Sequence, residues 1–446
     1  MNFRKLLLIT LAVLVICQLG WAQQKADYVR DLAIRAQQLG HGLPVVPASA
    51  IRPGQSRPFI WVGGLVTEGL TPKVGMNIPS VCNTLRSYGT LMCPNGLQTA
   101  YGVPFKNTPA GRLNDGTGTT IAIVDAFHYA NADADLAANT ANLGMPACTK
   151  ANGCFKDLDQ YGNDATNTTC GDAVANGWAV EIMLDLVYAH AMAPGAKLVL
   201  VEGCTNYDSD LYQAVITAAG LADVVSNSWG GGEYSGETGT DWVFNQNKPV
   251  LFASGDSGTP AIYPCASPYA TCVGGTTLQI NFTTLQRTNE TGWSGSGGGC
   301  SPYEPIPGYQ ASNGVNLCSS FRALPDIAAD GSDQSPVLLY YSGSGTLGGY
   351  RVWGTSLATP LMAGILASDM QARGGKFLHQ IDGDLYTRGC HGTANCVGAG
   401  QLNPYFFYDV TVGNNGLPAG PGFDMVTGMG VAFGKSMGGV YGIPTP

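Results

Sequence analysis

The chain has 446 residues, only 12% of them charged, and its 22 Lys and Arg against 31 Asp and Glu give a net charge of −9. An ordinary soluble chain is about 25% charged, and nucleic-acid binders are basic, so we expect no nucleic-acid partner. Hydrophobic residues make up 45%, which excludes general disorder. The length permits one large domain or two to three smaller ones.

The first 22 residues have the pattern of a secretory signal peptide. Arg4 and Lys5 precede the apolar run Leu6 to Cys17, and Gly20-Trp21-Ala22 offers a small-x-small cleavage site. The apolar run is shorter than the about 20 residues that a membrane helix needs. We therefore expect residues 1–22 to be removed on export. The protein would be secreted, extracellular or periplasmic, with no membrane partner.

Without Cys17, twelve cysteines remain, and an even number in an exported chain favours disulfides over metal ligation. No pair has the two-residue separation of a zinc knuckle. Spacing alone leaves the connectivity open. Pairing each cysteine with its neighbour in sequence gives Cys82–Cys93, Cys148–Cys154, Cys170–Cys204, Cys265–Cys272, Cys300–Cys318 and Cys390–Cys396.

Residues 23–95 are mixed in pattern, and we interpret them as a short N-terminal extension or a shortened pro-region. A helical stretch is predicted near Ala26 to Leu39 and is followed by the Pro/Gly-rich run Leu43 to Pro58. Residues 96–446 are predicted to form the main domain.

Strand and helix alternate from Thr119 onward. The patterns predict strands over residues 120–124, 197–202, 223–228 and 249–253, and helices over 178–192 and 209–219. This alternation predicts an α/β fold with a mainly parallel sheet flanked by helices. Sites in such sheets lie at the carboxyl ends of strands, and three strands end in polar or Gly-rich turns, at Asp125, Trp229 and Asp256.

The helix predicted over 178–192 is apolar almost all round, so we expect it to be buried. Glu181, Asp185 and His190 interrupt it. Glu181 and Asp185 are four residues apart and share a face, and two desolvated carboxylates at that spacing would share a proton. The alternatives are a solvated face or a salt bridge with a Lys or Arg. His190 is interpreted as an ordinary core or surface histidine.

The segment Gly354-Thr355-Ser356-Leu-Ala-Thr-Pro360 places a serine at the start of an apolar helix. A helix N-terminus favours developing negative charge, which suits a nucleophilic Ser356. Taken alone, the motif is better explained as an ordinary N-cap. Asp256 in its Gly/Ser turn would by itself be a turn former.

Together these motifs resemble the sedolisin (serine-carboxyl) peptidases, which are relatives of subtilisin. The resemblance rests on Glu181-x-x-x-Asp185, then residues 254–258 with Asp256, then Gly354-Thr355-Ser356-x-x-x-Pro360, and it runs from about residue 97 to 441. It implies a subtilisin-like fold and hydrolysis of protein or peptide substrates through an acyl-enzyme on Ser356. The activation domain usual in that family is larger than residues 23–95.

The same resemblance implies a role for each acidic residue. Glu181 would be the general base for Ser356, Asp185 would support Glu181, and Asp256 would help form the oxyanion hole. A buried glutamate can act as base because its pKa is raised, whereas Asp256 must be neutral to donate a hydrogen bond. Both requirements predict activity in acid. Asp125 and Trp229 match positions that the family links in a network to the Glu181–Asp185 pair, which is called the dyad below. The alternative is that each of the two residues only packs in the core.

The C-terminal runs 408–413 and 419–424 resemble the family's calcium site. Carboxylates and backbone carbonyls in a Gly-rich loop suit a hard cation. Carried over by position, one structural Ca²⁺ would be held by the side chains of Asp409 and Asp424 and the carbonyls of Val410, Gly420 and Gly422. The alternative is an array of turns without metal.

Two other functions stay open at this point. A subtilisin-type Ser/His/Asp protease could use Asp125 as its acid, but His128 and His190 lack the expected His-Gly-Thr context, and His391 follows Ser356. The other is a secreted, non-catalytic binding protein on the same scaffold. We expect a monomer in each case.

Overall fold

The computed structural model describes residues 28–68, 91–103, 114–343, 345–377, 379–390 and 395–433. The signal peptide predicted at residues 1–22 lies outside these ranges, as does Cys82. Among the described helices, none combines the length and the apolar character needed to cross a membrane.

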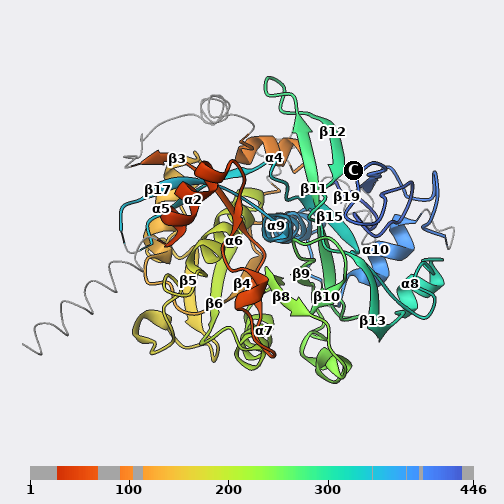
Figure 1. Ribbon diagram of the computed structural model, residues 1–446, viewed down its shortest axis with the longest axis horizontal. Helices are drawn as coiled ribbons and strands as arrows, with labels where there is room; N and C mark the ends of the chain where they lie inside the picture. The colour runs from red at the N-terminus through yellow and green to blue at the C-terminus, as the bar shows by residue number, and fades with distance from the viewer. Residues whose placement is uncertain are drawn as a thin grey trace, which may run out of the picture.

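A ten-stranded sheet runs through the centre of the molecule (Figure 1), in the order β18-β19-β15-β11-β9-β7-β4-β6-β5, with β12 paired to β11. Neighbouring strands are parallel except in the β11–β12 and β18–β19 pairs. The strands are β4 (Thr120–Ala126), β5 (Phe155–Asp159), β6 (Lys197–Gly203), β7 (Val224–Asn227), β9 (Val250–Ala253), β11 (Thr271–Ile280), β12 (Arg287–Gly292), β15 (Ile327–Asp330), β18 (Phe407–Tyr408) and β19 (Val431–Ala432). The mainly parallel α/β fold predicted from the alternation is confirmed.

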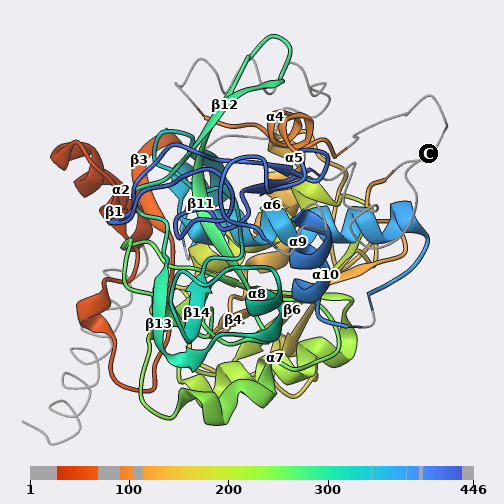
Figure 2. The same ribbon diagram turned by 90° about the vertical axis from the view of Figure 1, so that its right-hand side faces the viewer.

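Two buried helices lie on one side of this sheet. Helix α6 (Ala179–Met192) packs against α9 (Thr355–Arg373), and α9 contacts β4, β7, β9, β11 and β15. Helix α7 (Asp208–Leu221) contacts β4, β6 and β7 from the other side (Figure 2). Every residue of α6 is buried, because the helix is enclosed by the sheet and by neighbouring helices. The sequence prediction of a buried helix over 178–192 is therefore confirmed.

The described part of the N-terminal extension is built into two smaller sheets. Strand β3 (Trp61–Glu68) lies antiparallel between β1 (Leu43–Pro44) and β17 (Gly348–Trp353), which also pairs with β16 (Val337–Tyr341). Strand β2 (Arg57–Pro58) pairs antiparallel with β8 (Trp229–Gly232), and β8 pairs with β10 (Ile262–Tyr263). The Pro/Gly-rich run thus contributes two short strands, β1, which pairs with the nearby β3, and β2, whose partner β8 lies far away in sequence.

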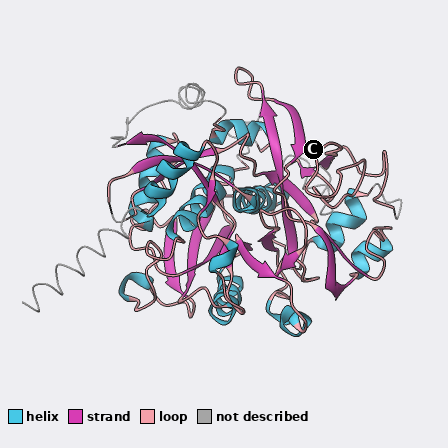
Figure 3. Ribbon diagram, viewed as in Figure 1, coloured by secondary structure: helices cyan, strands magenta, loops and turns pink. Residues whose placement is uncertain are grey.

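The remaining elements surround these sheets (Figure 3). They are α2 (Tyr28–Leu39), η1 (Ala48–Ala50), α4 (Pro94–Ala100), α5 (Ala132–Asn142), η2 (Ala165–Asn167), η3 (Glu237–Val243), β13 (Gly299–Pro305), α8 (Gly308–Ser312), β14 (Phe321–Leu324) and α10 (Asp382–Gly389).

Five of the six predicted neighbour disulfides are present. They are Cys148–Cys154, Cys170–Cys204, Cys265–Cys272, Cys300–Cys318 and Cys390–Cys396. Cys93 is also disulfide-bonded, and its predicted partner Cys82 lies outside the described residues.

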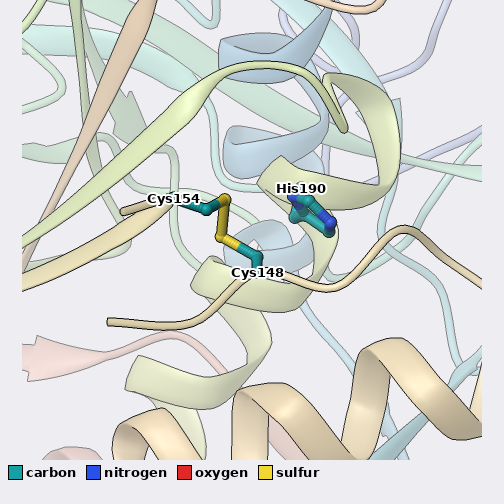
Figure 4. A group of neighbouring side chains, drawn as sticks. All are labelled: Cys148, Cys154 and His190. Atoms are coloured by element: carbon teal, nitrogen blue, oxygen red, sulfur yellow. A yellow bond between two sulfur atoms is a disulfide. The ribbon is translucent and has the colours of Figure 1, made fainter. Parts of the chain in front are cut away.

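One of these disulfides lies beside His190 on α6 (Figure 4). The sulfur atoms of Cys148 and Cys154 are bonded to each other, so neither is a free thiolate for a metal. His190 is fully buried, its Nε2 donates to the carbonyl of Pro146 at 2.8 Å, and burial lowers its pKa. This histidine is therefore a neutral core residue, as the sequence suggested.

Candidate active site

Three polar segments meet where β4, β7 and β9 end. Asp125 lies near the end of β4, Ser228 and Trp229 follow β7, and Asp256 follows β9. Asp125 and Ser228 are fully buried, and Asp256 is 6% exposed. The start of α9 reaches the same edge, since Thr355 contacts Asp256. The three strand ends singled out from the sequence thus border one site.

Ser356 occupies the first turn of α9, directly after β17. Gly354 precedes the helix with a φ of 138°, a conformation that side chains disfavour. A Cβ at Gly354 would lie 2.1 Å from the Phe59 carbonyl oxygen and 2.7 Å from Asp256 Oδ2. A glycine is therefore required at position 354. The Phe59 carbonyl oxygen and Asp256 Oδ2 both lie close to the backbone at this glycine.

Glu181 and Asp185 form a buried carboxyl pair on α6, and both are fully inaccessible to solvent. Burial raises the pKa of both groups well above the ordinary value, and the charge of Asp185 raises that of Glu181 further. The Ser356 hydroxyl acts in the opposite direction on the pKa of Glu181. Two such groups cannot both ionise cheaply, so at least one of the two keeps its proton.

The alternatives considered for this pair are not met. The helix has no solvated face at Glu181 and Asp185, and no described Lys or Arg forms an ion pair with either. Asp185 instead accepts a hydrogen bond from the Ser228 hydroxyl at 2.9 Å, which moderates the rise in its pKa.

Asp256 is held by the start of α9. The backbone N–H and the hydroxyl of Thr355 donate to its Oδ1 at 2.8 and 2.9 Å. Burial raises the pKa of Asp256 to about 7, although Thr355, Arg57 and Trp61 act to lower it. In acid the carboxyl is therefore protonated and has a proton to donate.

Asp125 and Trp229 form no hydrogen bond to Glu181 or Asp185 among the described residues. Neither Asp125 oxygen has a hydrogen-bond partner among the described residues. Burial raises the pKa of Asp125 well above its ordinary value, and the charges of Asp185 and Glu202 add to this. The Trp229 indole donates to the Val124 carbonyl at 2.8 Å. The charge of Asp185 thus raises the pKa of Asp125, and that of Asp125 raises the pKa of Glu181, whereas the Trp229 ring packs against Tyr212 and Phe252.

The chain's own residues 57–61 cross this site, which the sequence did not reveal. The Phe59 N–H lies 3.2 Å from the Ser228 carbonyl oxygen and 3.1 Å from Ser356 Oγ. The Ser356 N–H donates to the Phe59 carbonyl at 3.3 Å. The Phe59 backbone thus contacts Ser356 through both its N–H and its carbonyl, and the carbonyl oxygen lies on the side of Asp256. Ser228 is likewise a site residue that no motif indicated.

No described histidine hydrogen-bonds to Ser356. His128 Nδ1 lies 2.6 Å from a Glu202 oxygen, and His190 donates to a backbone carbonyl. His41 contacts the Gly42 carbonyl, and His379 pairs with Asp384. His391 lies outside the described residues. A Ser/His/Asp triad is therefore not formed by the part of the chain that the structure describes.

In the loop expected to bind calcium, the two carboxylates each accept hydrogen bonds from backbone N–H groups of residues 420–422. The Gly422 N–H donates to Asp409, 3.2 and 3.0 Å from its two oxygens, and the Gly420 N–H donates to Asp424 at 3.0 Å. Burial raises the pKa of Asp409, and raises that of Asp424 to about 6. No described Lys, Arg or His pairs with either. Two carboxylates without a described counter-ion are compatible with a hard cation, which prefers oxygen ligands.

Comparisons with known proteins agree with this architecture. The sequence pattern of the subtilase family (Peptidase_S8) matches residues 154–382. Kumamolisin of Bacillus sp. (strain MN-32) is 31% identical over 72% of this chain and 59% of its own length. Sedolisin of Pseudomonas sp. (strain 101) is 26% identical over 73% of this chain and 56% of its own length. Human tripeptidyl-peptidase 1 is 34% identical over 41% of this chain and 35% of its own length.

A solved structure matches as well. The structure of Pseudomonas sedolisin, a serine-carboxyl proteinase complexed with two molecules of pseudo-iodotyrostatin, superimposes with a TM-score of 0.60 at 24% identity. The match covers 78% of this chain and 97% of the other, and it establishes a subtilisin-like fold. The chain belongs to the subtilase family, and its relatives place it in the sedolisin branch. It spans 59% or less of the length of the relatives described above.

Proposed function

We propose that the protein is a secreted serine-carboxyl peptidase that hydrolyses peptide bonds of proteins in acid. One observation carries the proposal: a peptide carbonyl, that of Phe59, accepts from the Ser356 N–H beside Asp256. An oxyanion hole needs this arrangement of donors around a carbonyl oxygen. Export is supported by the five disulfides.

The reaction follows from the side chains around Ser356. The Ser356 oxygen attacks the substrate carbonyl while its proton passes to Glu181, which shares a proton with Asp185. The Ser356 N–H and protonated Asp256 donate to the resulting oxyanion. Glu181 then protonates the departing amine, leaving an ester on Ser356. A water molecule, deprotonated by Glu181, hydrolyses that ester and restores the serine.

The pH dependence follows from Asp256. Its pKa of about 7 means that the carboxyl donates a hydrogen bond below that pH and loses its proton above it. An ionised Asp256 would repel the oxyanion. Activity is therefore expected in acid and falls as the pH rises through about 7.

We also propose that residues 23–95 are a shortened pro-region. Support comes from Phe59, whose carbonyl and N–H take the contacts that a substrate would need at Ser356. N-terminal sequencing after acid incubation tests this proposal. A new N-terminus between residues 60 and 96 is expected, and a chain still beginning before residue 60, yet fully active, would contradict it.

We further propose one structural Ca²⁺, held by the side chains of Asp409 and Asp424 and the carbonyls of Val410, Gly420 and Gly422. Such an ion would neutralise two half-buried or buried carboxylates and tie the C-terminal loop together.

The experiment that tests the function is digestion of an unfolded protein at pH 4 after acid incubation, with the Ser356→Ala variant as the control. Cleavage that disappears in the variant supports the proposal. Cleavage that persists would identify another nucleophile. No cleavage by either protein would favour the alternative function, a non-catalytic binding protein. We expect the peptidase to act as a monomer on protein or peptide substrates.

A further inference from the structure

A histidine and two carboxyl groups that the proposed reaction does not use meet at strands β4, β5 and β6. His128 follows β4, Asp157 lies in β5, and Glu202 lies in β6. Asp157 is aligned with Leu200, two residues before Glu202, so Asp157 and Glu202 project from the same face of the sheet. The His128 ring reaches the same place, because its Nδ1 lies 2.6 Å from Glu202 Oε2.

The donor atoms of these three side chains are close enough to share one ion. A ring nitrogen of His128 and one carboxylate oxygen each from Asp157 and Glu202 all lie within 4.8 Å of one another. Donors that bind one zinc ion at about 2.0–2.2 Å lie at most about 4.4 Å apart. Small movements of the side chains therefore convert this arrangement into a zinc site.

Asp157 supplies an observation that is independent of the clustering. It is 4% exposed, yet its Oδ1 has no hydrogen-bond partner among the described residues. Its Oδ2 lies 3.4 Å from the Nζ of Lys150, whose side chain is 38% exposed. A buried carboxylate oxygen without a partner is costly. A cation beside Oδ1 would remove that cost.

Glu202 is held in a fixed position at the same place. It is buried, and its Oε1 accepts a hydrogen bond from the Tyr129 N–H at 3.0 Å. Such a second partner orients a metal-binding side chain. Burial raises the pKa of Glu202 to about 7 and also raises that of Asp157. The neighbouring His128 and Lys150 therefore do not fully compensate the two carboxylates for their loss of water.

We propose that His128, Asp157 and Glu202 bind one Zn²⁺ ion, which ties together the three strands β4, β5 and β6. A histidine nitrogen with carboxylate oxygens is a zinc donor set, whereas Ca²⁺ takes oxygen ligands. Three protein donors leave a fourth position for water. The ion would enter past the His128 side chain, which is 17% exposed. It would repel the ammonium of Lys150, and that exposed side chain can turn into solvent.

The first test locates the ion directly. Crystals of the full-length chain carrying Ser356→Ala, which prevents self-digestion, are soaked in zinc chloride at pH 7.5, because zinc needs deprotonated ligands. Anomalous scattering is then measured at the zinc absorption edge. A peak within about 2.3 Å of a donor atom from each of His128, Asp157 and Glu202 is expected. No peak at this place, whether or not zinc binds elsewhere, overturns the proposal.

A second test measures affinity in solution. Zinc is titrated by calorimetry at pH 7.5 in excess calcium, which occupies sites built from oxygen ligands alone. The Ser356→Ala chain should bind one zinc ion at this site. Adding Asp157→Asn should weaken that binding at least about tenfold, since the loss of even an outer partner of a metal ligand costs 10–100-fold. Unchanged affinity in Asp157→Asn overturns the proposal.

The matched control is Asp384→Asn in the same Ser356→Ala chain. Asp384 also contacts a histidine, His379, at 2.9 Å, but both side chains are partly exposed. This control should keep the affinity of the parent chain, and zinc should raise the melting temperature of both. A loss of zinc binding in Asp384→Asn equal to that in Asp157→Asn would place the ion elsewhere. If Asp157→Asn does not fold, the crystal test decides. None of these measurements depends on peptidase activity.

Discussion

Two buried acidic sites in this molecule differ in how their charge is compensated. Asp326 is fully buried and receives hydrogen bonds from Arg322 at 2.5 Å, the Cys272 N–H at 2.7 Å and the Tyr386 hydroxyl at 2.7 Å. Glu181 and Asp185 are equally buried but have no described cation as a partner. A paired buried charge is a structural feature. An unpaired carboxyl pair is costly, and its raised pKa values suit proton transfer.

The largest expected effect comes from removing the proposed base. Glu181→Gln keeps the size of the side chain but cannot accept the Ser356 proton, so we expect kcat/KM to fall by about 10⁴-fold. The measurement is peptide hydrolysis at pH 4. A variant that retains a tenth of the wild-type activity would contradict the role of Glu181.

The same variant also tests stability. Burial raises the pKa of Glu181 in the folded protein, so the unfolded chain releases this proton more readily as the pH rises above its ordinary value of about 4.3. The dyad therefore costs stability at neutral pH and little in acid. Glu181→Gln should melt at or above the wild-type temperature at pH 7. A clear loss of stability at that pH would argue for a structural role instead.

The opposite result, a loss of stability without a loss of activity, is expected at the buried site where Asp326 is paired with Arg322. Asp326→Asn leaves the buried guanidinium of Arg322 without its counter-ion, which costs about 3–5 kcal/mol. Denaturant unfolding should show this loss. The activity per folded molecule should stay close to that of the wild type. A variant that is stable but inactive would remove the distinction between the two sites.

Asp256→Asn separates hydrogen bonding from titration. The amide donates to an oxyanion at every pH, so the decline of activity near the pKa of about 7 should disappear. Loss of the carboxyl's own geometry should still reduce kcat by roughly 10²-fold at pH 4. Rates at pH 4 and pH 8 test this. A variant that retains the wild-type decline would assign that decline to another group.

Removal of calcium should have the smallest effect on the site. Chelation is expected to lower the melting temperature by an amount that corresponds to about 2–4 kcal/mol of binding at saturating ion. The variant Asp409→Asn should melt at the same temperature with and without chelator. A wild-type melting temperature unaffected by chelation would rule out the ion.

The sequence predicted the sheet and the acidic helix because both depend on local pattern. The α6 helix is apolar throughout, and Glu181 and Asp185 are visible as exceptions in it. The paths of β2 and β3 were not predictable in this way, because their partners β8 and β17 lie far away in sequence and no periodicity marks them. For the same reason Ser228, an ordinary residue at a strand end, was not recognised. Trp229 matched a motif, whereas its hydrogen bond to Val124 required the structure.

The measurement that tests the account most directly is the dependence of kcat/KM on pH for the acid-incubated wild-type chain, with Ser356→Ala as the blank. The account predicts cleavage at pH 4 that falls as the pH passes about 7, where Asp256 ionises, and no cleavage by the variant at any pH. A wild-type rate that stays constant from pH 4 to beyond pH 8 would contradict a mechanism based on protonated carboxyl groups.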